Sequence, residues 1–338
     1  MSNKIKTGLL SYGMSGKLFH APFLKAHEGF ELSAVVERSA KQANQKYPTL
    51  ISYNSVDDLL TDETIDLIVV NTPNSTHFEF ALKAIHHNKH VLVEKPFTVT
   101  SSEAKILFRE AKKNNRQILA FQNRRYDSDF LSVKQVIDSG QLGHLIEAHF
   151  RFDRYKLTPS LKTAKETSTP GSGLLYDLGP HLLDGVISLF GAPLNWRKNL
   201  GHFRPETKVD DYANIHLSYP SQLQVFITAS LLVADEQPAF ILHGSKGSYI
   251  KRRADVQERQ LLEGISVSNA SFGAEEAGIE GILTTMSENG TKKIAKIVSE
   301  KSSYINLFND VHKTIRDGKP YPITAAQIIK QLEILEAN

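Results

Sequence analysis

The chain has 338 residues, of which 41% are hydrophobic and 23% charged, and its formal net charge is +3. This length suits two domains, and the positive charge forms no basic stripe with interleaved aromatics, which argues against a nucleic-acid partner. The absence of cysteine excludes disulfides, thiolate metal sites and a cysteine nucleophile.

The start of the chain, MSNKIKTGLLSYG, lacks the apolar stretch and the small-residue cleavage site of a signal peptide. No run approaches the roughly 20 apolar residues that a membrane span needs. We therefore expect a soluble, cytoplasmic protein that binds neither a membrane nor a nucleic acid.

Apolar runs alternate with helical stretches over the first part of the chain. The runs are rich in Val, Ile and Leu and have no polar face, as expected for strands covered on both sides. Strands are predicted at 5–12, 30–37, 66–72, 90–95 and 117–123, and helices at 15–29, 39–47, 55–62, 76–89 and 100–115. Good N-cap residues open three helices: Ser55, Thr76, and Ser101 or Ser102. The alternation predicts an α/β fold, a doubly wound parallel sheet of the Rossmann type over residues 1–122.

The pattern changes near residue 123, where a larger α+β domain, residues 123–338, is predicted to begin. A half-buried, antiparallel strand is predicted at 144–155, because Ile146, Ala148, Phe150 and Phe152 alternate with polar residues. Further strands are predicted at 213–220, 223–233 and 239–252, helices at 122–143, 174–190 and 325–337, a polar loop at 156–172, and irregular structure at 254–300. Whether the closing helix packs back on the first domain is left open.

A glycine loop follows the first predicted strand. The segment SYGMSGK, residues 11–17, keeps the G-x-G-x-x-G spacing with Ser11 in the first place, then Gly13 and Gly16. Gly13 would let the backbone approach a pyrophosphate, Gly16 would let the helix pack closely on the strand, and the helix start offers N–H groups to the anion. The loop, with Met14 and Ser15 in its middle, predicts a dinucleotide site.

Two opposite signals about the cofactor stand at the end of the second strand. Glu37 lies 21 residues after Gly16, where an acid grips the ribose 2′-hydroxyl of NAD, and Arg38 beside it could hold the 2′-phosphate of NADP. The sequence therefore predicts NAD or NADP and leaves the preference open.

The next two long strands end in polar residues at the carboxyl edge of the sheet, where open α/β sheets bind ligands. One end carries Asn71, Thr72, Pro73 and Asn74 and, shortly after, His77. These are predicted to contact the cofactor, although for Asn71 and His77 simple turn chemistry is an equally good interpretation.

The other strand end reads Glu94-Lys95-Pro96. A lysine there can donate a proton or clamp an oxygen, so Glu94 is predicted to face the cofactor and Lys95 both the cofactor and the substrate oxygen. Whether the Lys95–Pro96 bond is cis is left open.

The apolar helix at 174–190 carries a polar turn. Asp177 and His181 are four residues apart and share a helical face, and Asp184 lies three residues further on. A carboxylate beside an imidazole fixes its tautomer and stabilises its charged form, and Pro180 should bend the helix here. The alternative is a helix cap followed by a structural histidine.

Four motifs together resemble the Gfo/Idh/MocA family of NAD(P)-dependent oxidoreductases. They are the glycine loop, the TPN segment at 72–74, the EKP segment at 94–96, and the DxxxHxxD pattern of Asp177, His181 and Asp184. GKLFHAPF, QNRRYDSDF, FRFDRY and LLYDLGPHLLD further resemble the family's NADP-dependent scyllo-inositol dehydrogenase branch. The resemblance implies a Rossmann domain followed by a large, open-faced, mostly antiparallel sheet, a homodimer or homotetramer formed through that sheet, and a sugar or polyol substrate. Carried over by position, Lys95, Asp177 and His181 would be the catalytic group.

These features lead to the hypothesis of metal-free hydride transfer at a secondary alcohol or ketone. Polar residues near the domain junction in sequence are candidate substrate ligands: Arg124, Asp153, Tyr155 and Asp184. Two alternatives stay open. One is other chemistry on the same scaffold, such as an elimination or the reduction of a non-sugar carbonyl. The other is a regulator that binds NAD(P) without chemistry.

Overall fold

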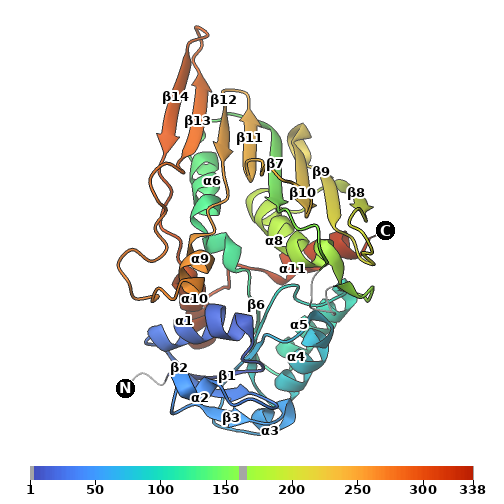
Figure 1. Ribbon diagram of the computed structural model, residues 1–338, viewed down its shortest axis with the longest axis vertical. Coiled ribbons are helices and arrows are strands. Elements are labelled where there is room, and N and C mark those ends of the chain that lie inside the picture. The colour runs from blue at the N-terminus through green and yellow to red at the C-terminus, as the bar shows by residue number, and fades with distance from the viewer. Residues whose placement is uncertain (1–3, 160–165, 338) are drawn as a thin grey trace. The chain divides into compact units, whose positions relative to one another are not determined.

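The computed structural model describes residues 4–159 and 166–337 (Figure 1). The chain divides into two compact units. The first takes Met1–Asn123, Gln257–Phe272 and Ser303–Ile329, and the second takes Arg124–Val256, Gly273–Ser302 and Lys330–Asn338. The first break lies one residue from the predicted boundary, but two later segments return to the first unit.

A six-stranded parallel sheet forms the first unit, and its order β3-β2-β1-β4-β5-β6 is that of a Rossmann domain. Its strands are β1 (Ile5–Leu9), β2 (Phe30–Val36), β3 (Ile51–Tyr53), β4 (Leu67–Val70), β5 (His90–Val93) and β6 (Ile118–Ala120). The central strands β4 and β5 are apolar and buried along most of their length, because helices cover both faces. The predicted fold is confirmed, but the three-residue β3 was missed, since it is too short to show a periodic pattern.

The helices of the first unit follow the expected alternation. They are η1 (Gly16–His20), α1 (Ala21–Ala26), α2 (Ala43–Lys46), α3 (Val56–Leu60), η2 (Asn74–Thr76), α4 (His77–His86), α5 (Ser101–Lys113), α9 (Val256–Leu262) and α10 (Tyr304–Asp317), where η marks a short turn and α9 begins in the second unit. In space α4 lies beside α5, and α1 lies beside α10 (Figure 1).

Helix starts were predicted with mixed success. Ser55 caps α3 as predicted, since its hydroxyl accepts from the N–H of Asp58. Thr76 precedes α4, but its side chain makes no capping bond. The prediction for α5 was wrong: the cap is Thr100, which forms a capping box with Glu103. The reciprocal bond to Glu103 explains why Thr100 is preferred over the serines after it.

The second unit contains an eight-stranded sheet in the order β14-β13-β12-β11-β7-β10-β9-β8. Its strands are β7 (Leu145–Asp153), β8 (Asn195–Gly201), β9 (Tyr212–Ser218), β10 (Gln224–Ser230), β11 (Phe240–Gly244), β12 (Gly247–Lys251), β13 (Gly281–Met286) and β14 (Lys292–Ile297). All neighbours are antiparallel except β7 and β10, which are parallel. This mixed, mostly antiparallel sheet confirms the predicted second domain.

Helix α8 (Gly173–Phe190) packs along β7, β9 and β10, and α6 (Ser128–Asp138) packs by β12 (Figure 1). The unit also holds η3 (Asn123–Tyr126, whose first residue belongs to the first unit), η4 (Pro220–Gln222) and most of α11 (Ala325–Glu336). Two sequence predictions need correction. Residues 254–300 are not wholly irregular but include the β13–β14 hairpin, whose exposed lysines hid its period. Ile146 is 53% exposed, so the buried side of β7 begins only at Ala148.

Part of the predicted polar loop, residues 160–165, lies outside the described residues.

Candidate functional site

The ends of β1 and β4 are joined by three hydrogen bonds between Ser11 and Asn71. The Ser11 N–H donates to the Asn71 side-chain oxygen at 2.9 Å, and the Asn71 amide returns a bond to the Ser11 carbonyl at 2.9 Å. The Ser11 hydroxyl donates to the backbone carbonyl of Asn71 at 3.1 Å. Ser11 therefore replaces the first glycine of the motif with a side chain that ties the loop to the next strand.

The two glycines of the loop have different steric surroundings. A Cβ at Gly16 would lie 2.5 Å from the Ser11 carbonyl oxygen and 3.0 Å from the Asn71 amide nitrogen, so only glycine fits. A Cβ at Gly13 would meet only the Ser11 hydroxyl, at 3.6 Å. The backbone at Gly13 is therefore open to a ligand, with Met14 exposed and Ser15 half-buried beside it. This open glycine on a tied loop fits a dinucleotide pyrophosphate.

Glu37 is buried after β2, and its carboxylate is already engaged. It accepts from the backbone N–H groups of Gln42 and Ala43 at 2.8 and 3.1 Å and from the Ser52 hydroxyl at 2.8 Å. Because a carboxylate offers about four acceptor positions, little capacity is left for a ribose. Its neighbour Arg38 is exposed. These contacts favour a structural role for Glu37, and its predicted role in cofactor binding stays a prediction.

His77 is fully buried and connects the ends of β4 and β5. Its Nδ1 lies 2.8 Å from the carbonyl oxygen of Pro96, and its Nε2 lies 2.9 Å from that of Thr72. Burial lowers the pKa of His77, although the hydrogen bonds to these two carbonyls act to raise it. The contacts favour a structural role for His77, in which its ring links the ends of β4 and β5. Pro73 is exposed and Asn74 half-buried at the same turn, where they could reach a ligand.

Glu94 and Lys95 follow β5, and both are half-buried. The Lys95–Pro96 bond is cis. One carboxylate oxygen of Glu94 lies 2.8 Å from Nε2 of His20, and the other accepts from the backbone N–H of Lys95 at 3.2 Å. Burial acts to raise the pKa of Glu94, but the hydrogen bond and charge of His20, with Lys95 and His77, lower it overall. Sequence reasoning missed His20, which the structure brings to the predicted site.

Helix α8 carries the predicted catalytic pair of the second unit. Asp177 and His181 lie one helical turn apart and are half-buried. The helix start is fixed by Asp210, whose carboxylate accepts from the Leu175 N–H at 2.6 Å. Gly173, at φ +87°, leaves room for that carboxylate, because a Cβ would lie 2.0 Å from it. Burial raises the pKa of Asp210 despite these bonds. Asp210 is a second residue that the sequence did not indicate.

Pro180 lies inside α8 as predicted, and its carbonyl accepts from the buried side chain of Gln331 at 2.8 Å. The turn of α8 that lacks an N–H at Pro180 is therefore supported by a hydrogen bond from α11.

The four predicted substrate ligands lie in the second unit, and three of them already have charged partners. Arg124 is 3.1 Å from both Asp127 and Asp255. Arg151 pairs with Asp153 at 3.0 Å. The guanidinium of Arg125 grips the buried Asp184 through two bonds, of 2.6 and 2.8 Å.

Tyr155 is 61% exposed, in contrast to these paired residues. The ion pairs favour a structural role for the charged candidates, and substrate binding by all four residues stays a prediction.

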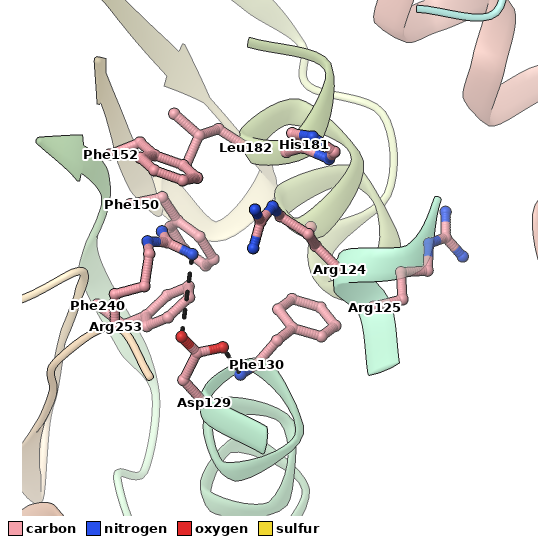
Figure 2. A pocket seen from close by; sticks show the side chains of 11 residues that line it. Arg124, Arg125, Asp129, Phe130, Phe150, Phe152, His181, Leu182, Phe240 and Arg253 are labelled. Carbon is pink, nitrogen blue, oxygen red and sulfur yellow. Dashed lines mark hydrogen bonds and ion pairs between the residues drawn. The ribbon is translucent and has the colours of Figure 1, made fainter. Parts of the chain in front are cut away.

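A small cavity of the second unit lies beside His181 (Figure 2). Its volume is about 20 Å³, the space of one water molecule. The guanidinium of Arg124 points into it, while that of Arg125 turns away (Figure 2). Arg253 stacks on Phe152 with its guanidinium carbon 4.1 Å from the ring centroid. The cavity thus places charged donors next to the predicted base.

Within residues 4–159 and 166–337, no group of three or more His, Cys, Asp or Glu side chains is placed to hold a metal ion. Over the same residues, every helix is too short or too polar to cross a membrane.

Known proteins match both units. Residues 5–122 match an oxidoreductase family with an NAD-binding Rossmann fold, and residues 130–250 match the GFO/IDH/MocA C-terminal domain. The chain is 36% identical to the uncharacterised oxidoreductase YdgJ of Escherichia coli (strain K12), over 99% of this chain and 96% of that protein. It is 31% identical to the scyllo-inositol 2-dehydrogenase (NADP(+)) IolW of Bacillus subtilis (strain 168), over 98% and 92%.

A solved structure agrees with these matches. The crystal structure of an oxidoreductase from Bacillus cereus aligns with a TM-score of 0.91 at 31% identity, over 98% of this chain and 95% of that one. The chain therefore belongs to the Gfo/Idh/MocA family of oxidoreductases, and its Rossmann domain binds NAD or NADP.

Proposed function

We propose that the protein is a dehydrogenase that moves a hydride between NAD(P) and a secondary alcohol or ketone of an inositol-like polyol or sugar. The observation that carries the proposal is Lys95, half-buried beside the ionised Glu94 at the carboxyl edge of a Rossmann sheet. The name of the 31% identical relative IolW gives scyllo-inositol as its substrate, which supports a cyclic polyol here.

In the proposed mechanism His181 takes the proton of the substrate hydroxyl, and Asp177 orients its ring. Lys95 donates a hydrogen bond to the same oxygen and stabilises its charge as the carbonyl forms. Bound NAD(P) supplies the hydride acceptor or donor. Proton transfer by positioned side chains contributes about 10²–10⁴ in rate.

The proposal predicts measurable turnover of cyclic polyols. Purified protein is incubated with scyllo-inositol, myo-inositol and simple sugars, each with NAD and with NADP, and the absorbance of the reduced nicotinamide is followed. Product analysis separates an oxidation from an elimination, and corresponding ketones test the reductive direction. Tight cofactor binding without turnover of any of these compounds would favour the regulator, and turnover of non-sugar carbonyls alone would favour the other reductase.

We also propose that the protein assembles into a homodimer or homotetramer through the eight-stranded sheet. Ile250 and Ile294 are exposed on the face of this sheet that α8 and α6 do not cover, which supports an interface there. Light scattering of the same preparation tests the assembly, and a monomer at assay concentration would exclude it.

The contacts after β2 favour NADP over NAD. The carboxylate of Glu37 is held by the chain itself, whereas Arg38 is exposed. A second cation stands near this side of the loop: Lys17 donates to Gln42 at 2.7 Å. A 2′-phosphate is recognised by charge-assisted hydrogen bonds from such groups.

Replacing Arg38 with alanine should therefore weaken binding of 2′,5′-ADP by about 10- to 100-fold, because one charge-assisted bond contributes about 1.5–3 kcal/mol. Binding of 5′-AMP should not change. Calorimetry measures both affinities, and Arg109→Ala, on the exposed side of α5, is the matched control. Equal affinity of the wild-type protein for the two nucleotides would disprove the preference.

A further inference from the structure

His20 lies where the glycine loop becomes a helix, in a turn wider than an α-helix. In η1 the N–H of Ala21 donates to the carbonyl of Gly16, five residues earlier. The cause is two residues further along the chain. Pro22 has no N–H for the carbonyl of Leu18 and its ring crowds that carbonyl, so a regular α-turn is disfavoured there. Such single wide turns are frequent at functional sites.

The wide turn buries His20 completely and aims its ring at the end of β5. Nε2 is 2.8 Å from Oε1 of Glu94, a residue 74 positions later in the chain. The ring of Phe121 holds the imidazole at a centroid distance of 4.4 Å, and Phe308 meets it edge-on at 6.3 Å. Among the described residues Nδ1 has no hydrogen-bond partner, and a carboxylate only accepts, so Nε2 carries the proton of this bond. His20 therefore donates to Glu94.

The donated bond keeps Glu94 ionised in a place where burial opposes its charge. The charged and titratable groups that face this carboxylate are His20, Lys95 and His77, and together they lower its pKa. With one oxygen fixed by His20, the side chain keeps 13% of its surface exposed. An oriented, partly exposed carboxylate is a strong acceptor for the hydroxyl groups of a sugar.

The strand order indicates which part of the cofactor meets Glu94. The glycine loop follows β1, Arg38 follows β2 on one side of it, and Glu94 follows β5 on the other side, in the order β2-β1-β4-β5. A dinucleotide with its pyrophosphate at the loop and its adenosine toward β2 extends its nicotinamide half toward β4 and β5.

We infer that His20 is a positioning residue that sets the Glu94 carboxylate to accept the hydroxyls of the nicotinamide-side ribose, linking the phosphate loop to the strand end that carries Lys95. The inference rests on the cofactor site of the proposed function and not on the identity of the substrate. Failure to find a polyol substrate would leave it standing, because its test measures binding.

The test compares a whole cofactor with its adenosine half. His20→Met removes the donor at similar volume, and we expect NADPH to bind about tenfold more weakly while 2′,5′-ADP binds as before. His20→Gln, which keeps an N–H donor, should recover most of the affinity. In His20→Met the loss of NADPH affinity should grow as the pH is lowered, because Glu94 without its hydrogen-bond donor takes up a proton more easily. His27→Gln, on a half-buried histidine bonded to Asn309 in the same unit, is the control.

Each outcome decides the inference. A selective loss of NADPH affinity that His20→Gln restores supports it. Equal losses for NADPH and 2′,5′-ADP would mean that His20 only holds the loop together, and unchanged NADPH binding would mean that Glu94 needs no positioning, so either result overturns the inference. If His20→Met does not fold, His20→Asn takes its place, because the asparagine amide is too short to reach Glu94. It should likewise weaken binding of NADPH and leave binding of 2′,5′-ADP unchanged.

Discussion

Replacing Lys95 with methionine is expected to lower kcat by about 10²–10⁴-fold, the range for a positioned proton donor. Methionine keeps much of the length and the apolar stem of the side chain but has neither the charge nor the N–H donors. In the proposed mechanism Lys95, half-buried beside Glu94, is the cation that stabilises the charge developing on the substrate oxygen. Steady-state kinetics with the best polyol, together with cofactor titration, measures the effect.

The pattern of kinetic changes separates chemistry from folding. Affinity for NADPH should fall much less than kcat, and Lys113→Met, on the exposed last turn of α5, should leave kcat unchanged. Near-full turnover in Lys95→Met with intact cofactor binding would remove Lys95 from the mechanism. A parallel collapse of cofactor affinity would instead give it a binding role.

Replacing Asp184 with asparagine is expected to lower the free energy of unfolding by about 3 kcal/mol, the lower end for breaking a buried ion pair. Asp184 is 3% exposed and holds the guanidinium of Arg125 through two short bonds. The neutral amide removes a negative charge that faces the nearly buried guanidinium of Arg125. Urea unfolding followed by circular dichroism gives the difference.

Two further variants test whether Asp184 acts through its ion pair with Arg125 or as a ligand of the substrate. Asp138→Asn breaks the exposed pair with Lys134 and should leave stability unchanged. The double variant Arg125→Met with Asp184→Leu should recover most of the lost stability, since an apolar pair of similar size can replace a buried ion pair. If Asp184→Asn raised the KM for the polyol without loss of stability, Asp184 would be a substrate ligand as its sequence position predicts.

The Rossmann half of the fold was predictable because its signals are local. Continuous apolar runs mark the covered strands, and the glycine loop marks the first crossover. The β13–β14 hairpin was not predictable in the same way. Its strands lie at one edge of the sheet and carry Lys292, Lys293 and Lys296, a composition typical of protected edges and of loops alike.

The candidate site was predictable only where its residues stand at strand ends. Lys95, Glu94 and Asn71 follow apolar runs, so their place at the carboxyl edge could be argued from the sequence. His20 and Glu94 are 74 residues apart, and Arg125 and Asp184 are 59 residues apart, so no local pattern pairs them. One signal for His20 was present: Pro22 stands inside a predicted helix and indicates a distorted turn upstream.

The first unit is discontinuous in sequence, so its packing can be completed only late in synthesis, when its last segment leaves the ribosome. Phe23 of α1 stacks on Phe308 of α10 at a centroid distance of 5.8 Å, and Phe30 of β2 meets the same ring edge-on at 6.1 Å. The nascent chain exposes these early aromatic rings until Phe308 emerges, on the order of tens of seconds later at ordinary elongation rates. A gene fragment ending at residue 123 encodes the whole parallel sheet and yet leaves this aromatic cluster open to chaperones or to aggregation.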